Sequence, residues 1–208
     1  MVRQFDSDRK LLAFYRRFKN KPILDVLNSL EPDLKEKILA HKSHDKGRVG
    51  LIMEGLTGRY PNSEKTPDIV ELGIEIKTFP LEKFHGAYRP KYRAKINSIN
   101  YKILPNQEWE TCSTKLKMNK ILFISYYHEP GCTLAKDWQI FKLKDFFIYN
   151  LHENEPENVQ LAWEYIRNKV ARLKAHELSE GDTVSKMPSV REYKAMNLIV
   201  KILFYVKQ

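Results

Sequence analysis

The chain has 208 residues, of which 42% are hydrophobic, so it can bury a sizeable core and is not a disordered polypeptide. Its 36 Lys and Arg residues against 26 Asp and Glu give a net charge of +10, which favours a polyanionic partner, nucleic acid before a membrane surface. No apolar run approaches the roughly 20 residues of a membrane-spanning helix, so we expect a soluble cytoplasmic protein without a membrane partner. Two cysteines, Cys112 and Cys132, are too few for a disulfide framework.

Helical periodicity dominates residues 1–58. Apolar residues recur at helix-like spacing in "DRKLLAFYRRF", and prolines precede or open the helical stretches "PILDVLNSL" and "DLKEKILAHK". We expect a fourth helix from an Asp45 cap to Gly58. Its apolar face would consist of Val49, Ile52, Met53 and Leu56.

Residues 59–150 change to the alternating pattern of strands. "DIVELGIEIKTF" predicts a hairpin or a bent strand around Gly73, "KILFISYY" a buried strand, and "WQIFKLKDFFIY" one or two more. Residues 82–107 are basic and aromatic with little periodicity, which indicates a long arm or irregular strands.

Residues 151–208 begin with a long amphipathic helix, "NVQLAWEYIRNKVARLKAHEL", and end with "LIVKILFYV", for which a strand is favoured. Helices before and after a set of strands predict a mixed α/β fold. We therefore expect one domain over residues 1–208, with a helical part, a sheet and a C-terminal part.

Three charged residues interrupt the otherwise apolar stretch "PDIVELGIEIKTFP" at positions 67–80. Glu75 and Lys77 would share one face of a strand, and a turn at Gly73 could return Asp68 to them. Two carboxylates that hold Mg²⁺ beside a lysine are suited to phosphodiester hydrolysis, because the cation offsets their repulsion of a phosphate. The alternative is a solvated face of an antiparallel sheet.

Three segments in order resemble the PD-(D/E)xK nucleases of the MutH-like branch, which contains the mismatch-repair nicking enzyme MutH and GATC-cutting restriction enzymes. They are "KGRVGLIMEGLTG" (46–58), "PDIVELGIEIKTFPL" (67–81) and "WETCSTKLKMNKILFISYY" (109–127). A fourth segment, "KAHELSEGDT" (174–183), is similar to the restriction-enzyme members. The resemblance implies a restriction-endonuclease-like mixed sheet flanked by helices, in two lobes around a DNA cleft.

The resemblance also implies the roles of the site residues. Asp68, Glu75 and the main-chain carbonyl of Ile76 would bind Mg²⁺, for which Mn²⁺ substitutes, with Glu54 as an outer or water-mediated ligand. Lys77 would position the attacking water, and Lys117 matches a second active-site lysine. Hydrolysis by such a site would leave a 5′-phosphate.

Contacts with double-stranded DNA are expected from basic residues near this site. Lys46 and Arg48 would lie near a helix N-terminus, and Lys115 on the same segment as Lys117. The run "YRPKYRAK" adds Arg89 and Arg93, with a solvated basic loop as the alternative. Such contacts set affinity and salt dependence.

The C-terminal segment departs from the family pattern. Tyr193 in "REYKAMN" can be aligned with the tyrosine of the family's site-reading segment, but the recognition lobe is shortened, which puts GATC specificity in doubt. The leading hypothesis is a Mg²⁺-dependent type II restriction enzyme, which would act as a homodimer or by two successive nicks. The alternatives are a MutH-like nicking enzyme stimulated by MutL and a non-catalytic DNA-binding module.

Overall fold

Four helices form the first part of the chain in the computed structural model, which describes residues 2–41, 45–60, 66–91, 95–98, 100–153, 156–173 and 203–205. They are α1 (Asp8–Arg16), α2 (Ile23–Asn28), α3 (Pro32–Ala40) and α4 (Asp45–Gly55). Ser7 caps α1 by accepting a hydrogen bond from the backbone N–H of Lys10. Pro32 opens α3, where its missing N–H is not needed. The expected helices are confirmed, although α4 begins at Asp45 itself and ends at Gly55.

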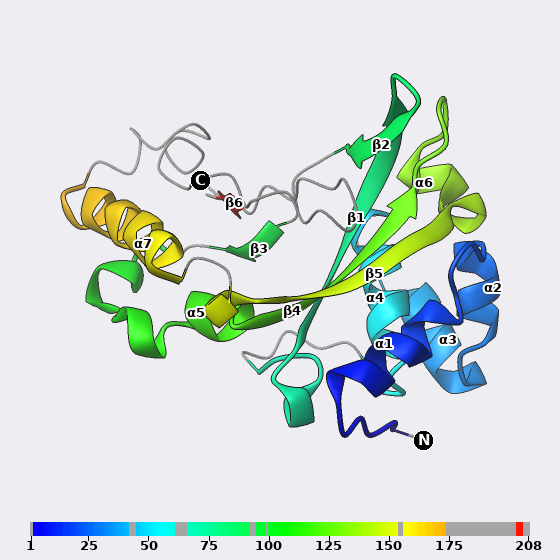
Figure 1. The fold of residues 1–208 in the computed structure, drawn as a ribbon, viewed down its shortest axis with the longest axis horizontal. Helices are drawn as coiled ribbons and strands as arrows, with labels where there is room; N and C mark the ends of the chain where they lie inside the picture. Colours follow the sequence, from blue (N-terminus) through cyan, green and yellow to red (C-terminus); the bar gives the residue numbers. More distant parts are fainter. Residues whose placement is uncertain are drawn as a thin grey trace.

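A mixed four-stranded sheet follows, with the spatial order β2, β1, β4, β5 (Figure 1). β1 runs parallel to β4 and antiparallel to β2, and β5 is antiparallel to β4. The strands are β1 (Glu75–Phe84), β2 (Ala87–Pro90), β4 (Lys120–Tyr127) and β5 (Lys142–Asn150). This sheet flanked by helices confirms the predicted mixed α/β class and is consistent with a restriction-endonuclease-like fold.

Shorter elements connect the strands. They are the 3-10 helices η1 (Val70–Leu72), η2 (Leu104–Asn106), η3 (Trp109–Thr111), η4 (Trp138–Ile140) and η5 (Leu151–Glu153), and the helices α5 (Ser113–Met118) and α6 (Leu134–Asp137). The helix α7 (Pro156–Ala171) realises the predicted long C-terminal helix. β3 (Lys95–Ser98) pairs in parallel with β6 (Leu203–Tyr205), which lies within the expected tail strand.

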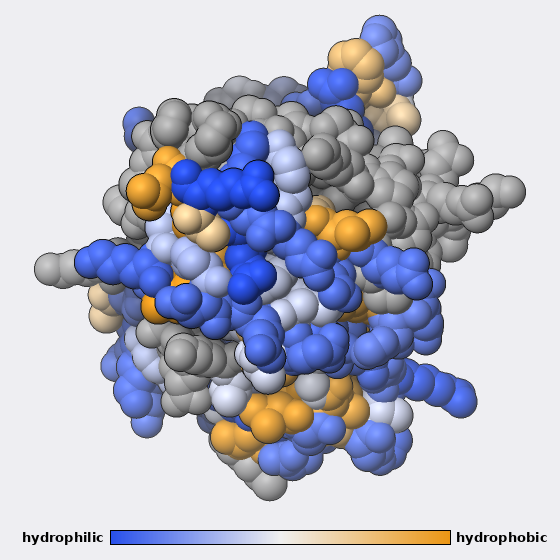
Figure 2. Space-filling model, turned by 90° about the vertical axis from the view of Figure 1, so that its left-hand side faces the viewer, coloured by the Kyte–Doolittle hydropathy of each residue, from blue (hydrophilic) through white to orange (hydrophobic). Residues whose placement is uncertain are grey.

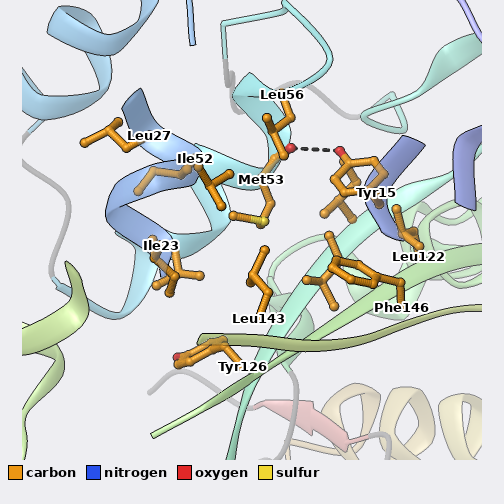
Figure 3. Close-up of a cluster of buried hydrophobic side chains, with 14 of the residues drawn as sticks. Tyr15, Ile23, Leu27, Ile52, Met53, Leu56, Leu122, Tyr126, Leu143 and Phe146 are labelled. Carbon is orange, nitrogen blue, oxygen red and sulfur yellow. Dashed lines mark hydrogen bonds between the residues drawn. The ribbon is translucent and has the colours of Figure 1, made fainter. Parts of the chain in front are cut away.

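One face of the sheet packs against the N-terminal helices. Ile76 of β1 and Leu122 of β4 belong to a buried cluster with Tyr15 of α1 and Met53 of α4. Figure 3 shows Tyr15, Met53 and Leu122 in this cluster. The Tyr15 hydroxyl donates a hydrogen bond to the carbonyl oxygen of Met53 at 2.8 Å. Within β1, Ile76 thus points to this core, whereas Phe84 at the other end of the strand is exposed.

The opposite face of the sheet supports a second core with α5 and α7. Phe79 of β1 and Phe123 of β4 pack in the same cluster as Trp109 and Trp163. β4 is thus covered on both faces, which explains why its sequence is apolar without alternation. Seen from the side of α5 and α7, the outer surface is mostly hydrophilic with smaller hydrophobic areas (Figure 2).

Of the two expectations for residues 82–107, a long arm or irregular strands, the structure favours strands, and the first of them form a regular β1–β2 hairpin. β1 continues to Phe84, and a two-residue turn with His85 at φ 47° and Gly86 at φ 82° leads into β2. Two left-handed residues match the right-handed twist of the strands. The hairpin extends the sheet beyond the region covered by α7 (Figure 1).

Some predictions fall outside the described residues. They concern Arg93, Tyr193, the segment 174–183 and the shortened recognition lobe. The division of the chain into three parts of one domain, and a DNA cleft between two lobes, stay predictions. Within the described residues, no helix combines the length and the apolar character that crossing a membrane requires.

Candidate active site

A tight turn before β1 brings Asp68 back to the start of the strand. Gly73 has φ 63°, a left-handed conformation that favours glycine, and the flanking residues Ile69 and Ile74 form an antiparallel bridge. Both isoleucines are fully buried, which fixes the turn against the core. Asp68 Oδ2 accepts a hydrogen bond from the backbone N–H of Ile76 at 2.7 Å. The return predicted from the sequence is confirmed, with η1 in place of a regular hairpin.

Glu75 is a buried carboxylate between two lysines. Its side chain is only 3% exposed, and its Oε1 lies 2.6 Å from Lys77 Nζ and 3.4 Å from Lys117 Nζ. Among the described residues its other oxygen, Oε2, has no hydrogen-bond partner although it is buried. An unsatisfied buried carboxylate oxygen costs free energy, so its retention indicates a position suited to binding a cation or a donor.

Glu54 of α4 interacts electrostatically with the same charged groups. Burial, and then the negative charge of Asp68, raise the pKa of Glu54 to about 8, while Lys77 and Lys117 act in the opposite direction. Burial and then the charge of Glu75 raise the pKa of Asp68 as well. Three carboxyl groups and two ammonium groups thus lie close enough to influence one another. All of the predicted catalytic side chains are brought together here.

Tyr15 is a neighbour of the site that sequence reasoning treated only as part of an apolar helix face. Its hydroxyl holds the carbonyl of Met53, the residue next to Glu54. Burial, and then the charges of Glu54 and Asp68, raise the pKa of Tyr15 well above its ordinary range. A tyrosine in "LLAFYRRF" carries no signal for this role, because the contact joins residues 38 positions apart.

The donor set fits a hard divalent cation that keeps several waters. Within the described residues, no group of three His, Cys, Asp or Glu side chains is gathered tightly enough to hold a metal ion alone. Mg²⁺ is commonly held by one or two carboxylates with water completing its shell. Asp68 accepts a hydrogen bond from the backbone N–H of Ile76, the residue that follows Glu75. The Oε2 atom of Glu75 accepts no hydrogen bond from any described residue and is therefore available as a metal ligand.

Three predicted DNA contacts have internal partners. The Arg48 guanidinium lies 5.7 Å from the Trp138 ring centroid, and among the described residues its buried Nε has no hydrogen-bond partner. Arg89 pairs with Glu82, at 2.8 Å from Nε and 2.7 Å from Nη2. Lys115 pairs with Glu110, which is exposed.

The other predicted DNA contacts cannot be placed at side-chain level. The backbone of Lys46 lies in the first turn of α4, but its side chain is outside the description, as are Arg93 and Tyr193. The structure therefore brings the acidic site together, whereas it leaves the DNA contacts as a prediction.

Comparison with known proteins agrees with this geometry. The family model of the DNA mismatch repair enzyme MutH matches residues 58–161, a segment that contains the turn at Gly73 and strands β1, β4 and β5. The chain belongs to the MutH family.

Relatives of this MutH-family chain include a restriction enzyme and repair proteins. The type II restriction enzyme Sau3AI of Staphylococcus aureus is 35% identical over 156 residues, which cover 74% of this chain and 31% of that enzyme. The mismatch repair protein MutH of Photorhabdus laumondii is 23% identical over 157 residues, covering 73% of this chain and 64% of that protein. MutH of Shewanella amazonensis is 23% identical over 177 residues, which cover 84% of this chain and 74% of that protein. The chain thus spans about a third of the restriction enzyme.

Proposed function

We propose that this MutH-family chain is a Mg²⁺-dependent, sequence-specific DNA endonuclease of the type II restriction kind. The observation that supports it best is the buried Glu75 carboxylate, held by Lys77 and Lys117 beside the returned Asp68. A purely structural ion pair would need only Glu75 and a lysine, so it would not explain Asp68 beside the start of β1 or Glu54 on α4. The 35% identity to a type II restriction enzyme points the same way.

The proposed roles follow from the positions of the side chains. Asp68, Glu75 and the main-chain carbonyl of Ile76 would hold the cation, with Glu54 outside them. When bound, Mg²⁺, or Mn²⁺ in its place, polarises the scissile phosphate and offsets its charge. Burial first, and the negative charges of neighbouring carboxylates second, raise the pKa values of Glu54 and Asp68, so a cation bound beside them would favour their charged forms.

The lysines would act on the water and the phosphate. Lys77 has a side chain that is 21% exposed and an Nζ that is hydrogen-bonded to Glu75, and this Nζ can donate to an attacking water and orient it toward phosphorus. Lys117 reaches the same carboxylate from α5 and would offset negative charge that develops in the transition state. The P–O3′ bond would break, leaving a 5′-phosphate on one product.

Double-stranded DNA is the proposed partner, with a GATC-type site as the expected target. The net charge of +10 favours binding to its phosphates. Arg48, Arg89 and Lys115 remain proposed contacts with these phosphates. Cutting both strands would require a homodimer on DNA or two successive nicks.

A second candidate is a nicking enzyme of mismatch repair, because the matched family model is that of MutH and repair proteins are among the relatives. Such an enzyme would cut one strand of hemimethylated DNA and respond to MutL. The two candidates share the proposed site and differ only in how DNA is chosen and how many strands are cut.

A plasmid assay tests both candidates. The protein is incubated with Mg²⁺ or with EDTA and with plasmid that is unmethylated, hemimethylated or fully adenine-methylated at GATC, and product ends are mapped. Linear product with 5′-phosphates at one sequence supports the restriction enzyme, and open-circle product on hemimethylated DNA supports the nicking enzyme. Absence of product with every plasmid, despite DNA binding, would overturn both in favour of a binding module.

A further inference from the structure

Two lysines and two tyrosines form a compact patch at the far end of β1. The Tyr88 and Tyr127 rings pack edge to face with centroids 5.3 Å apart. Lys83 Nζ lies 5.9 and 5.7 Å from the two centroids, and Lys144 Nζ lies 5.5 and 5.8 Å from them. Each of the four strands contributes one residue to this lysine–tyrosine patch, so the patch depends on the whole sheet.

The charges of the patch are positioned but not neutralised. Lys83 is exposed and Lys144 half-buried, and in the described part of the chain neither ammonium forms an ion pair with a carboxylate. The acidic neighbour of Lys144 along β5, Asp145, pairs instead with Lys19 at 3.8 Å. The ring faces hold both ammonium groups near one place, while their hydrogen-bond donors stay available to an anion.

The patch lies on the same face of the sheet as the candidate active site. Side chains of a strand alternate between faces, so Glu75, Lys77 and Lys83 of β1 all point to one side. Lys83 pairs in register with Tyr88, and Tyr127 pairs with the position two residues before Lys83. The six residues from Lys77 to Lys83 span about 20 Å, which corresponds to about six phosphates along one DNA strand.

We propose that the lysine–tyrosine patch binds backbone phosphates of the DNA duplex about 20 Å from the scissile bond. This inference rests on the proposed function for the identity of the polyanion and for the position of the cut. Two ammonium groups held at the same pair of rings can each contact a backbone phosphate, and such contacts position a duplex without reading its sequence. The patch would thus hold the duplex at a second point before cutting.

The salt dependence of DNA binding tests the patch without any cleavage. The full chain is titrated in EDTA with a fluorescent random-sequence duplex of about 30 base pairs, long enough for both ends of β1. In the double variant Lys83→Gln/Lys144→Gln, the slope of log K against log salt should become shallower by about 2, with affinity about tenfold or more lower near 0.1 M salt. The arginine pair Lys83→Arg/Lys144→Arg should restore most of the affinity, which excludes misfolding as the cause.

A matched control removes the same charge elsewhere. Lys37 of α3 and Lys136 of α6 are exposed, and both helices contact α4 on the other side of the sheet. The double variant Lys37→Gln/Lys136→Gln should keep the wild-type slope. Equal slopes for the two glutamine pairs would overturn the proposal. Because the assay contains no Mg²⁺ and scores no products, failure of the endonuclease proposal in the plasmid assay is a separate result.

Discussion

The two ends of β1 carry charge in opposite ways. At its start, Glu75 is buried and its charge is compensated by two lysines. The chemistry proposed for this end therefore depends on the positions of the neighbouring groups. At its far end, Lys83 is exposed, lies over tyrosine rings and has no acidic ion-pair partner among the described residues. The two proposals together assign to one strand a chemical task, which needs geometry, and an electrostatic task, which needs only charge.

The largest difference between the two ends should appear in the cleavage rate. Lys77→Ala removes the donor that would orient the attacking water, so we expect the rate at saturating DNA to fall by about 1,000-fold or more. Lys83→Ala should leave that rate within about threefold while weakening binding. Single-turnover cleavage and metal-free binding are measured for both. Full activity of Lys77→Ala would remove the chemical role from this end of the strand.

The pH dependence of folding stability tests the burial of the Glu54 carboxyl group. The pKa of Glu54 is raised to about 8 in the folded chain, so the folded state binds more protons than the unfolded state between its ordinary value and about 8. Stability in EDTA should therefore fall as pH rises from about 4.5 to 8, and Mg²⁺ should reduce the fall. Glu54→Gln should flatten the profile and raise Tm at pH 8 by several degrees, about 5 °C. Thermal denaturation over this pH range measures the effect. If Tm fell with pH as steeply in Glu54→Gln as in the wild type, Glu54 would not be buried among these charges.

The turn that returns Asp68 gives a smaller, structural effect. Gly73→Ala places a Cβ at φ 63° and should cost about 1 kcal/mol of folding free energy, because the surrounding space is open and only the backbone is strained. Gly131→Ala is a matched control, since Gly131 also has positive φ and open space around it but lies in the loop after β4, not in the turn that returns Asp68. Chemical denaturation should give similar losses for both, whereas cleavage should fall only for Gly73→Ala. Equal activity would show that the turn does not position Asp68 critically.

The smallest expected effect concerns the rings of the lysine–tyrosine patch. Tyr88→Leu keeps apolar bulk but removes one ring face from Lys83 and Lys144, so binding to the 30-base-pair duplex should weaken by about threefold. The slope against salt should stay at the wild-type value, because both charges remain. A changed slope would mean that the tyrosine alters the number of phosphates contacted.

The sequence predicted the start of β1 better than its end. Asp68 and Glu75 are close along the chain, and a single glycine turn relates them, so alternation and turn chemistry were enough. The family resemblance implied only that Lys117 is a second active-site lysine, and its contact with Glu75 requires the parallel alignment of β1 with β4. That alignment joins residues more than 40 positions apart, and local patterns do not specify such a register.

The patch could not be predicted for the same reason. Lys83 and Tyr88 are near in sequence, but Tyr127 and Lys144 join them only through β4 and β5, and Lys144 lies where the β4–β5 register shifts. The partner of Arg89 was also missed, although Glu82 faces it directly across the β1–β2 hairpin. Residues 82–107 lack periodicity because a two-residue turn interrupts the alternation at Gly86.

The parallel pairing of β1 with β4 also determines when, during folding, the candidate active site forms. Parallel strands are joined by long connections, and the loop between them must close before their contacts can form, which is slow compared with local helix formation. Lys77 can meet Glu75 as soon as the strand is extended, but Lys117 arrives only after the sheet has assembled. A chain still emerging from the ribosome therefore carries the Asp68–Lys77 motif before Lys117 can join it.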